Sequence, residues 1–274
     1  MSGKSSIEWT SATWNPTSGC TRVTAGCDGC YAFTLHDWRH AAYLKYNGVY
    51  PKTGKPMPQQ YARPFSEIQL LPERLEWPLH QKQPLRIFVD SMSDLFHSKI
   101  PDEYIHRVFE VMLEAHWHTF QVLTKRVGRL RRLGQHLPWA PHIWIGTSIE
   151  NDLVTARADA LRVVPAHIRF LSCEPLLGPL PSLNLDGIRW VITGGESGPS
   201  ARPCHPDWVR DLRDRCIERG ISFFHKQWGG RTPKAGGRLL DGRTWDEYPL
   251  QAGIGEIGVF DNNNALPVTL SLLT

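Results

Sequence analysis

The sequence lacks long hydrophobic runs. No apolar stretch reaches 18 residues, close to the length that a membrane-spanning helix needs, so we expect neither a membrane span nor a membrane partner. The opening residues, MSGKSSIEWTS, contain no apolar segment of the kind found in secretory signals. We therefore expect the protein in the cytoplasm.

Cysteine is scarce and unevenly distributed. Cys20, Cys27 and Cys30 stand at the spacing C-x6-C-x2-C, and the next cysteine along the chain is Cys173. A reducing cytoplasm disfavours disulfides, and three thiols cannot all pair with one another. The cluster therefore indicates a metal site or a catalytic site.

Neither sign of charge dominates. The chain has 31 basic and 27 acidic residues, a formal net charge of +4. This mild basicity permits a nucleic-acid partner without requiring one. Basic residues concentrate in TKRVGRLRRLGQH (124–136), which suits a helix that faces phosphates, although such runs are more often the solvated face of a helix.

Short β-branched or aromatic runs alternate with helical patterns through most of the chain. The strand-like runs lie in 85–97, 118–126, 142–151, 168–178, 188–198 and 221–230. Apolar strands that alternate with helices are typical of a parallel sheet buried on both faces. With a possible first strand near the cysteines, the pattern predicts an α/β fold, namely a single-domain, incomplete (β/α) barrel of six or seven parallel strands. A doubly wound open sheet is the alternative.

Two regions fall outside this rhythm. Residues 44–84 are rich in Pro, Lys and Gln and predict an inserted loop or lid with one short helix near SEIQLLPERL. Residues 251–274 predict an irregular C-terminal tail. The barrel domain is therefore expected to span 1–250.

Polar residues follow each predicted strand. In either architecture the ligand site lies at the carboxyl ends of the strands. Charged or hydroxyl side chains stand there after six strands in succession, in 90–94, 124–126, 147–150, 172–174, 193–197 and 226–228. The sequence therefore predicts a shared polar pocket at this edge of the sheet.

Three thiolates leave two kinds of metal site open. A structural zinc site normally has four ligands, and His36 and His40, in a helical pattern, are the candidates for the fourth. A [4Fe–4S] cluster is ordinarily held by four thiolates, so three leave one iron open for a substrate or cofactor. A flexible, glycine-rich loop suits the second case, because its sulfurs must reach different irons.

The segment NPTSGC…GCDGCYA (15–32) resembles the start of radical S-adenosylmethionine (SAM) enzymes, especially the branch around spore photoproduct lyase. That branch usually has the spacing C-x3-C-x2-C and an aromatic residue where Gly29 stands. The chain also resembles a phage and bacterial family built around this three-cysteine motif. Phrases such as SMSDLFH, LTKR, GGESG and LDGR carry that resemblance over most of residues 7–250.

The resemblance implies a set of ligands for the two cofactors. Cys20, Cys27 and Cys30 would hold a [4Fe–4S] cluster, and SAM would occupy its open iron through amino and carboxylate groups. The remaining cofactor-binding candidates are Ser91, Ser93 and Asp94 for the amino group, Lys125 and Arg126 for the carboxylate, and Ser148 and Glu150 for the ribose. On the substrate side, the catalytic candidates are Glu196 and Cys173, the latter as a hydrogen-atom donor; the alternative for Cys173 is a buried packing thiol.

The resemblance also implies an activity. It is that of a radical SAM-type enzyme, which generates a 5′-deoxyadenosyl radical for hydrogen abstraction and takes electrons from a donor such as flavodoxin or ferredoxin in a bacterial or phage-infected cell. A nucleic acid or nucleotide is the expected substrate. One alternative is a zinc- or cluster-stabilised nucleic-acid-binding protein without redox chemistry. Another is a hydrolytic enzyme that uses Asp94, Glu150, Glu174 and Glu196.

Overall fold

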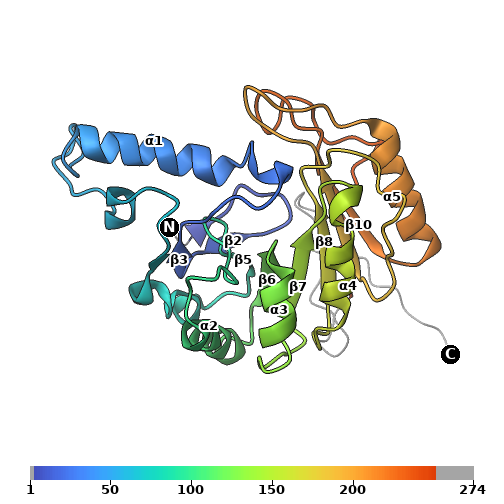
Figure 1. The fold of residues 1–274 in the computed structure, drawn as a ribbon, viewed down its shortest axis with the longest axis horizontal. Coiled ribbons are helices and arrows are strands. Elements are labelled where there is room, and N and C mark those ends of the chain that lie inside the picture. Colours follow the sequence, from blue (N-terminus) through green and yellow to red (C-terminus); the bar gives the residue numbers. More distant parts are fainter. Residues whose placement is uncertain (1–2, 251–274) are drawn as a thin grey trace.

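A curled, mostly parallel sheet of eight strands forms the centre of the computed structural model, which describes residues 3–250 (Figure 1). The predicted tail, 251–274, lies outside the described residues. The strands, in their order across the sheet, are β1 (Gly3–Lys4), β2 (Ala12–Trp14), β5 (Arg86–Val89), β6 (Thr119–Thr124), β7 (Ile143–Ser148), β8 (Arg169–Cys173), β9 (Trp190–Gly194) and β10 (Ser222–Gln227).

The order of the strands decides between the two predicted architectures. Seven strands are parallel to their neighbours, and only β1 is antiparallel. Neighbours follow chain order from one edge to the other, whereas a doubly wound sheet reverses its order part-way. The doubly wound alternative is therefore wrong. The sheet is a half-barrel with β1 and β10 as its edge strands, rather than a closed barrel.

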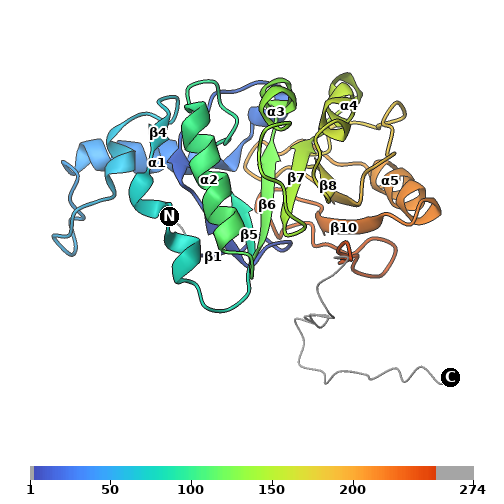
Figure 2. The ribbon, with the colours of Figure 1, turned by 90° about the horizontal axis from the view of Figure 1, so that it is seen from below.

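Alternate side chains of each strand enter two different cores, as the two-residue period of a strand requires. The even-numbered Phe88, Trp144 and Phe170 face an aromatic cluster on the concave side of the sheet. Their neighbours on the same strands face the helices. Those helices are α2 (Asp102–Glu114), α3 (Val127–Leu133), α4 (Ala156–Arg162) and α5 (Pro206–Glu218), which flank the curved row of strands (Figure 2).

The aromatic cluster fills the concave side of the half-barrel. The Trp190 ring lies at its centre, with the rings of Trp9, Trp144, Phe170 and Phe224 at centroid distances of 5.5–6.2 Å. Trp190 is fully buried. Because aromatic rings close this side, the open space of the half-barrel is restricted to the carboxyl ends of the strands.

The N-terminal region carries the cysteines and the insertion. It comprises β3 (Thr17–Ser18), α1 (Tyr31–Lys45) and β4 (Gln69–Leu70), with 3₁₀ helices at Ala25–Cys27, Gln59–Ala62, Pro72–Arg74 and Trp77–His80; another 3₁₀ helix, Asp152–Val154, follows β7. The short helix predicted near SEIQLLPERL is confirmed only in part, as the 3₁₀ helix Pro72–Arg74. Part of that segment pairs with β3 as β4, and Pro72, which has no amide hydrogen, begins a 3₁₀ turn.

No helix within residues 3–250 has both the length and the apolar character needed to cross a bilayer. This finding agrees with the absence of long hydrophobic runs in the sequence.

Candidate functional site

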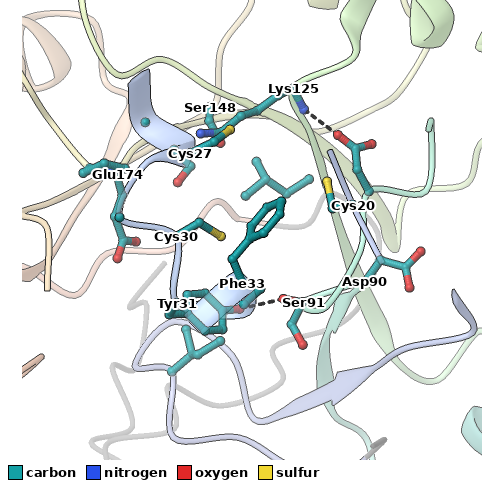
Figure 3. A pocket seen from close by; sticks show the side chains of 18 of the residues that line it. Cys20, Cys27, Cys30, Tyr31, Phe33, Asp90, Ser91, Lys125, Ser148 and Glu174 are labelled. Carbon is teal, nitrogen blue, oxygen red and sulfur yellow. Dashed lines mark hydrogen bonds between the residues drawn. The ribbon is translucent and has the colours of Figure 1, made fainter. Parts of the chain in front are cut away.

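A pocket with a cavity volume of about 200 Å³ lies at the carboxyl ends of the strands (Figure 3). Its floor is apolar and includes Trp9, Phe88 and Leu123, which belong to or pack against the aromatic cluster. Its polar wall comes from the segments that follow six parallel strands and includes Asp90, Ser91, Ser93, Asp94, Lys125, Ser148, Ser172, Glu174, Glu196, Ser197 and Lys226. The shared polar pocket predicted from the strand ends is confirmed.

All three clustered cysteines line this pocket. Cys20 follows β3, Cys27 ends a 3₁₀ helix, and Cys30 immediately precedes α1. Figure 3 shows their sulfur atoms around one cavity, with the ring of Phe33 reaching into it. Cys20 and Cys30 also pack against an apolar cluster that contains Phe33 and Phe65. The loop therefore presents three free thiols to one space.

Each of these cysteines follows a glycine, and each glycine lies against a different glutamate residue. A methyl group at Gly19, whose φ is +99°, would lie 2.3 Å from the carbonyl oxygen of Glu67. At Gly26 it would lie 2.4 Å from Cγ of Glu150, and at Gly29 it would lie 2.3 Å from Oε1 of Glu196. Because glycine has no side chain, the backbone of the cysteine loop can lie this close to Glu67, Glu150 and Glu196, and a larger residue at any of the three positions would clash. For this reason an aromatic residue does not fit at position 29.

Glu150 contacts the cysteine loop through Thr24 and does not line the pocket. Its side chain is almost fully buried, forms ion pairs with Lys125 and with Arg157 at 2.9 Å, and accepts a hydrogen bond of 2.8 Å from Thr24. Burial acts to raise the pKa of Glu150, but Lys125, Arg157 and Thr24 outweigh it and hold the pKa below its ordinary value. The predicted role of Glu150 at a ribose is not supported by this placement.

Lys125 and Arg126 place positive charge beside the thiols. Burial acts to raise the pKa of Cys27, but the charge of Lys125 and hydrogen bonds from the loop backbone lower it overall. Arg126 donates to Thr21 Oγ1 at 2.8 Å, and its Nη2 lies 3.8 Å from Cys20 Sγ. Burial nevertheless raises the pKa of Cys20 to about 12. A metal at Cys20 would have to displace that proton.

Glu196 connects the loop after β9 to the cysteine loop. Arg202 donates from Nε and Nη2 to the two carboxylate oxygens of Glu196, at 2.8 and 2.6 Å. The same Nη2 donates to the carbonyl oxygen of Ala25 at 2.8 Å. These hydrogen bonds from Arg202 hold the pKa of Glu196 below its ordinary value. Glu196 therefore lines the pocket as a carboxylate whose oxygens are already engaged.

The three residues expected at the SAM amino group, Ser91, Ser93 and Asp94, all line the pocket. All three also have structural partners, and Ser91 Oγ donates to Asn15 Oδ1 at 3.1 Å. Ser93 Oγ donates to the carbonyl oxygen of Gly19 at 2.8 Å, and Asp94 accepts a hydrogen bond of 2.6 Å from Thr124. Asp94 thus joins the loop after β5 to the end of β6, and Ser93 joins it to the cysteine loop.

Strand alternation separates Cys173 from the pocket. Phe170 faces the concave side, so Ser172 and Glu174 follow it there and line the pocket. Cys173 faces the opposite side and is fully buried in the helix-facing core, where burial raises the pKa of its thiol. This placement agrees with the packing alternative for Cys173. Ser148 lines the pocket, as expected.

Two polar features of the pocket involve residues to which the resemblance assigns no cofactor. Glu174 forms an ion pair with Lys226, which comes from β10. Asp90 has a left-handed φ of +62°, is 2 % exposed and accepts a hydrogen bond of 2.8 Å from Thr17 Oγ1. Burial raises the pKa of Asp90 to about 8, although Thr17 opposes the shift. All three residues stand in the strand-end segments from which the sequence predicts the pocket.

The two histidines proposed as a fourth ligand lie outside the pocket lining. His36 Nε2 interacts with the carbonyl oxygen of Arg63 at 2.9 Å, and His40 Nδ1 with that of Tyr61 at 2.8 Å. Within residues 3–250, no three His, Cys, Asp or Glu side chains are grouped closely enough to hold one metal ion.

Comparison with known proteins identifies a family whose description names no activity. A family model described as a protein of unknown function, DUF5131, matches residues 4–249. The chain belongs to this family. The match spans the half-barrel, the cysteine loop and the insertion. No curated protein and no solved structure matches the chain.

The close approach at Gly29 makes a prediction about stability. The substitution Gly29→Ala should lower the free energy of unfolding by about 1–3 kcal/mol, because Arg202 prevents Glu196 from moving away. Chemical denaturation measures this change. Gly128→Ala is the matched control, since a methyl group there meets nothing within 4 Å and lies in helix α3. It should be neutral or stabilising; equal losses in both variants would contradict the packing argument.

The raised pKa of Asp90 predicts a dependence of stability on pH. Between its ordinary value of 3.8 and about 8, the folded protein retains a proton that the unfolded chain releases. The contribution of Asp90 to the free energy of unfolding should therefore fall as pH rises through this window, by about 1.4 kcal/mol per pH unit. Asp90→Asn cannot ionise and tolerates a positive φ. The difference between wild type and variant should follow this slope; a constant difference would contradict it.

Proposed function

We propose that this protein is a radical SAM-type iron–sulfur enzyme, with a [4Fe–4S] cluster held by Cys20, Cys27 and Cys30. One observation carries the proposal: three thiols from a single loop line a polar pocket at the carboxyl ends of a parallel half-barrel. The lining that the structure describes contains no histidine that would complete a four-ligand zinc site.

The donor set suits a cluster better than a single ion. Zinc in a structural site requires four ligands that converge on one point. In a [4Fe–4S] cluster each thiolate binds a different iron, so the sulfurs need only surround a cavity. Nearby Lys125 and Arg126 would offset part of the negative charge of three thiolates. The apolar side formed by Phe33 and Phe65 would limit the access of water.

When bound, the cluster and SAM would supply an electron and a means of hydrogen-atom abstraction. The task of the chain is then to bind, orient and exclude water. The apolar floor, which includes Trp9 and Phe88, keeps water from one side of the pocket. The hydroxyls of Ser148 and Ser172 and the Glu174–Lys226 pair provide polar groups at the strand ends. Ser91 and Asp94 belong to the loop that the resemblance assigns to the amino group of SAM.

A hydrolytic role has less support. Glu150 does not line the pocket, and Glu174 is paired with Lys226. The carboxylates of Asp94 and Glu196 are engaged by neighbouring donors. General acid–base catalysis needs a carboxyl group within reach of the substrate and able to exchange a proton.

The proposal is tested by anaerobic purification and cluster reconstitution. We expect a brown protein with about four irons, bleached by dithionite and able to cleave SAM. Cys27→Ser should lose iron and SAM cleavage. Cys204→Ser is the matched control, because Cys204 is a partly exposed thiol that does not line the pocket, and it should retain both. A colourless protein with one tightly bound zinc, or equal iron in both variants, would contradict the proposal.

A further inference from the structure

Residues 31–66, named here the arm, extend from the cysteine loop away from the sheet (Figure 1). The arm consists of α1 and the first part of the insertion. It contains five basic residues, Arg39, Lys45, Lys52, Lys55 and Arg63, and one acidic residue, Asp37. Of the 31 basic and 27 acidic residues of the chain, 26 of each sign lie elsewhere. The whole net charge of +4 therefore resides in the arm.

One face of α1 forms an exposed stripe that begins at the pocket. Tyr31, Thr34, Trp38, Ala41 and Lys45 recur at helical spacing and are all exposed. Tyr31 also lines the pocket, and Trp38 is 71 % exposed. A tryptophan this exposed contributes little to packing within the chain. The stripe thus joins the mouth of the pocket to the outer end of the helix.

The opposite face of α1 packs against the returning end of the arm, residues 61–65. The rings of Phe33 and Phe65 are 4.7 Å apart at right angles, and His36 is bonded to the carbonyl oxygen of Arg63. Arg39 donates to the hydroxyl of Tyr61 at 2.5 Å. These contacts hold α1 against residues 61–65, and the amide of Cys20 donates to the carbonyl oxygen of Phe65 at 2.8 Å, which ties that segment to the cysteine loop.

The end of the arm combines aromatic and basic side chains. Tyr46 and Tyr50 are exposed, as are Lys45, Lys52 and Lys55. The amide of Tyr50 donates to the carbonyl oxygen of Lys55 at 2.9 Å, which folds this segment into a tight turn. Among the described residues, Lys45, Lys52 and Lys55 form no salt bridge.

We infer that the arm binds single-stranded nucleic acid. Exposed rings interleaved with cations are the combination that stacks on bases and neutralises phosphates, and every base has a face for stacking. Trp38, Tyr46 and Tyr50 would receive bases, and the lysines would pair with the backbone. A protein partner is less favoured, because the exposed Lys45, Lys52 and Lys55 would require an acidic partner. The inference rests on the proposed function in one respect: the strand would bring a nucleotide to the pocket at Tyr31.

The arm replaces the surface predicted from the basic segment 124–136. Arg129 of that segment is not available to phosphates, because its guanidinium donates to the carbonyl oxygen of Ile100 at 2.5 Å and pairs with Asp102. Of the lysines and arginines in that segment, Arg131 and Arg132 are exposed. Two exposed cations, in a segment without tryptophan or tyrosine, offer a nucleic acid fewer contacts than the arm does.

The test is a titration of fluorescently labelled single-stranded DNA and RNA oligonucleotides, followed by anisotropy at several salt concentrations. Trp38→Ala should weaken binding about 5- to 150-fold through lost stacking. The triple variant Lys45→Ala/Lys52→Ala/Lys55→Ala should reduce the slope of log affinity against log salt by about 2. Because the two variants are independent, misfolding of one leaves the other as a test.

Matched controls remove equivalent groups elsewhere. Ile217→Ala replaces an exposed apolar residue on α5, and Lys82→Ala/Arg231→Ala/Lys234→Ala removes three exposed charges. Both should bind like wild type. If all variants bind equally, or if Trp38→Ala changes the oligomeric state and not oligonucleotide binding, the inference is wrong. Binding is measured on metal-free and reconstituted protein alike, so binding without SAM cleavage contradicts only the proposed enzyme, and SAM cleavage without binding contradicts only the arm.

Discussion

The contact between the cysteine loop and two buried carboxylates is the constraint on which the site depends. Gly26 lies against Glu150 and Gly29 against Glu196, each at a distance that excludes even a methyl group. The carboxylates belong to the ends of β7 and β9, so the loop is positioned by the sheet itself. The three thiols consequently face the cavity at the strand ends, and α1 extends from the loop away from the sheet (Figure 1).

Buried carboxylates hold this position because their charges are compensated. Glu150 is paired with Lys125 and Arg157, and Glu196 with Arg202. An unpaired buried carboxylate would be costly, and removal of one partner from such a pair usually destabilises a protein strongly. Lys125 has a second effect, because its charge also lowers the pKa of Cys27. The electrostatics that fix the loop and those that prepare a thiolate are therefore shared.

The strands and the polar pocket could be predicted from the sequence, because both follow from local patterns of apolar and polar residues. The same two-residue period, counted from Phe170, would have distinguished the pocket residue Ser172 from the core residue Cys173. Two features depend on distant parts of the chain and had no local signal. One is the pairing of β4 with β3 in place of part of the predicted helix. The other is Arg202, which reaches the cysteine loop from 177 residues away in the sequence.

The central claim is that the three cysteines hold a cluster with one iron open to SAM. Electron paramagnetic resonance of the reduced, reconstituted protein, recorded with and without SAM, tests it most directly. The account predicts a [4Fe–4S] signal that changes when SAM is added, because SAM would bind the iron that lacks a cysteine ligand. A cluster signal identical in both samples, or the absence of any cluster signal, would contradict it.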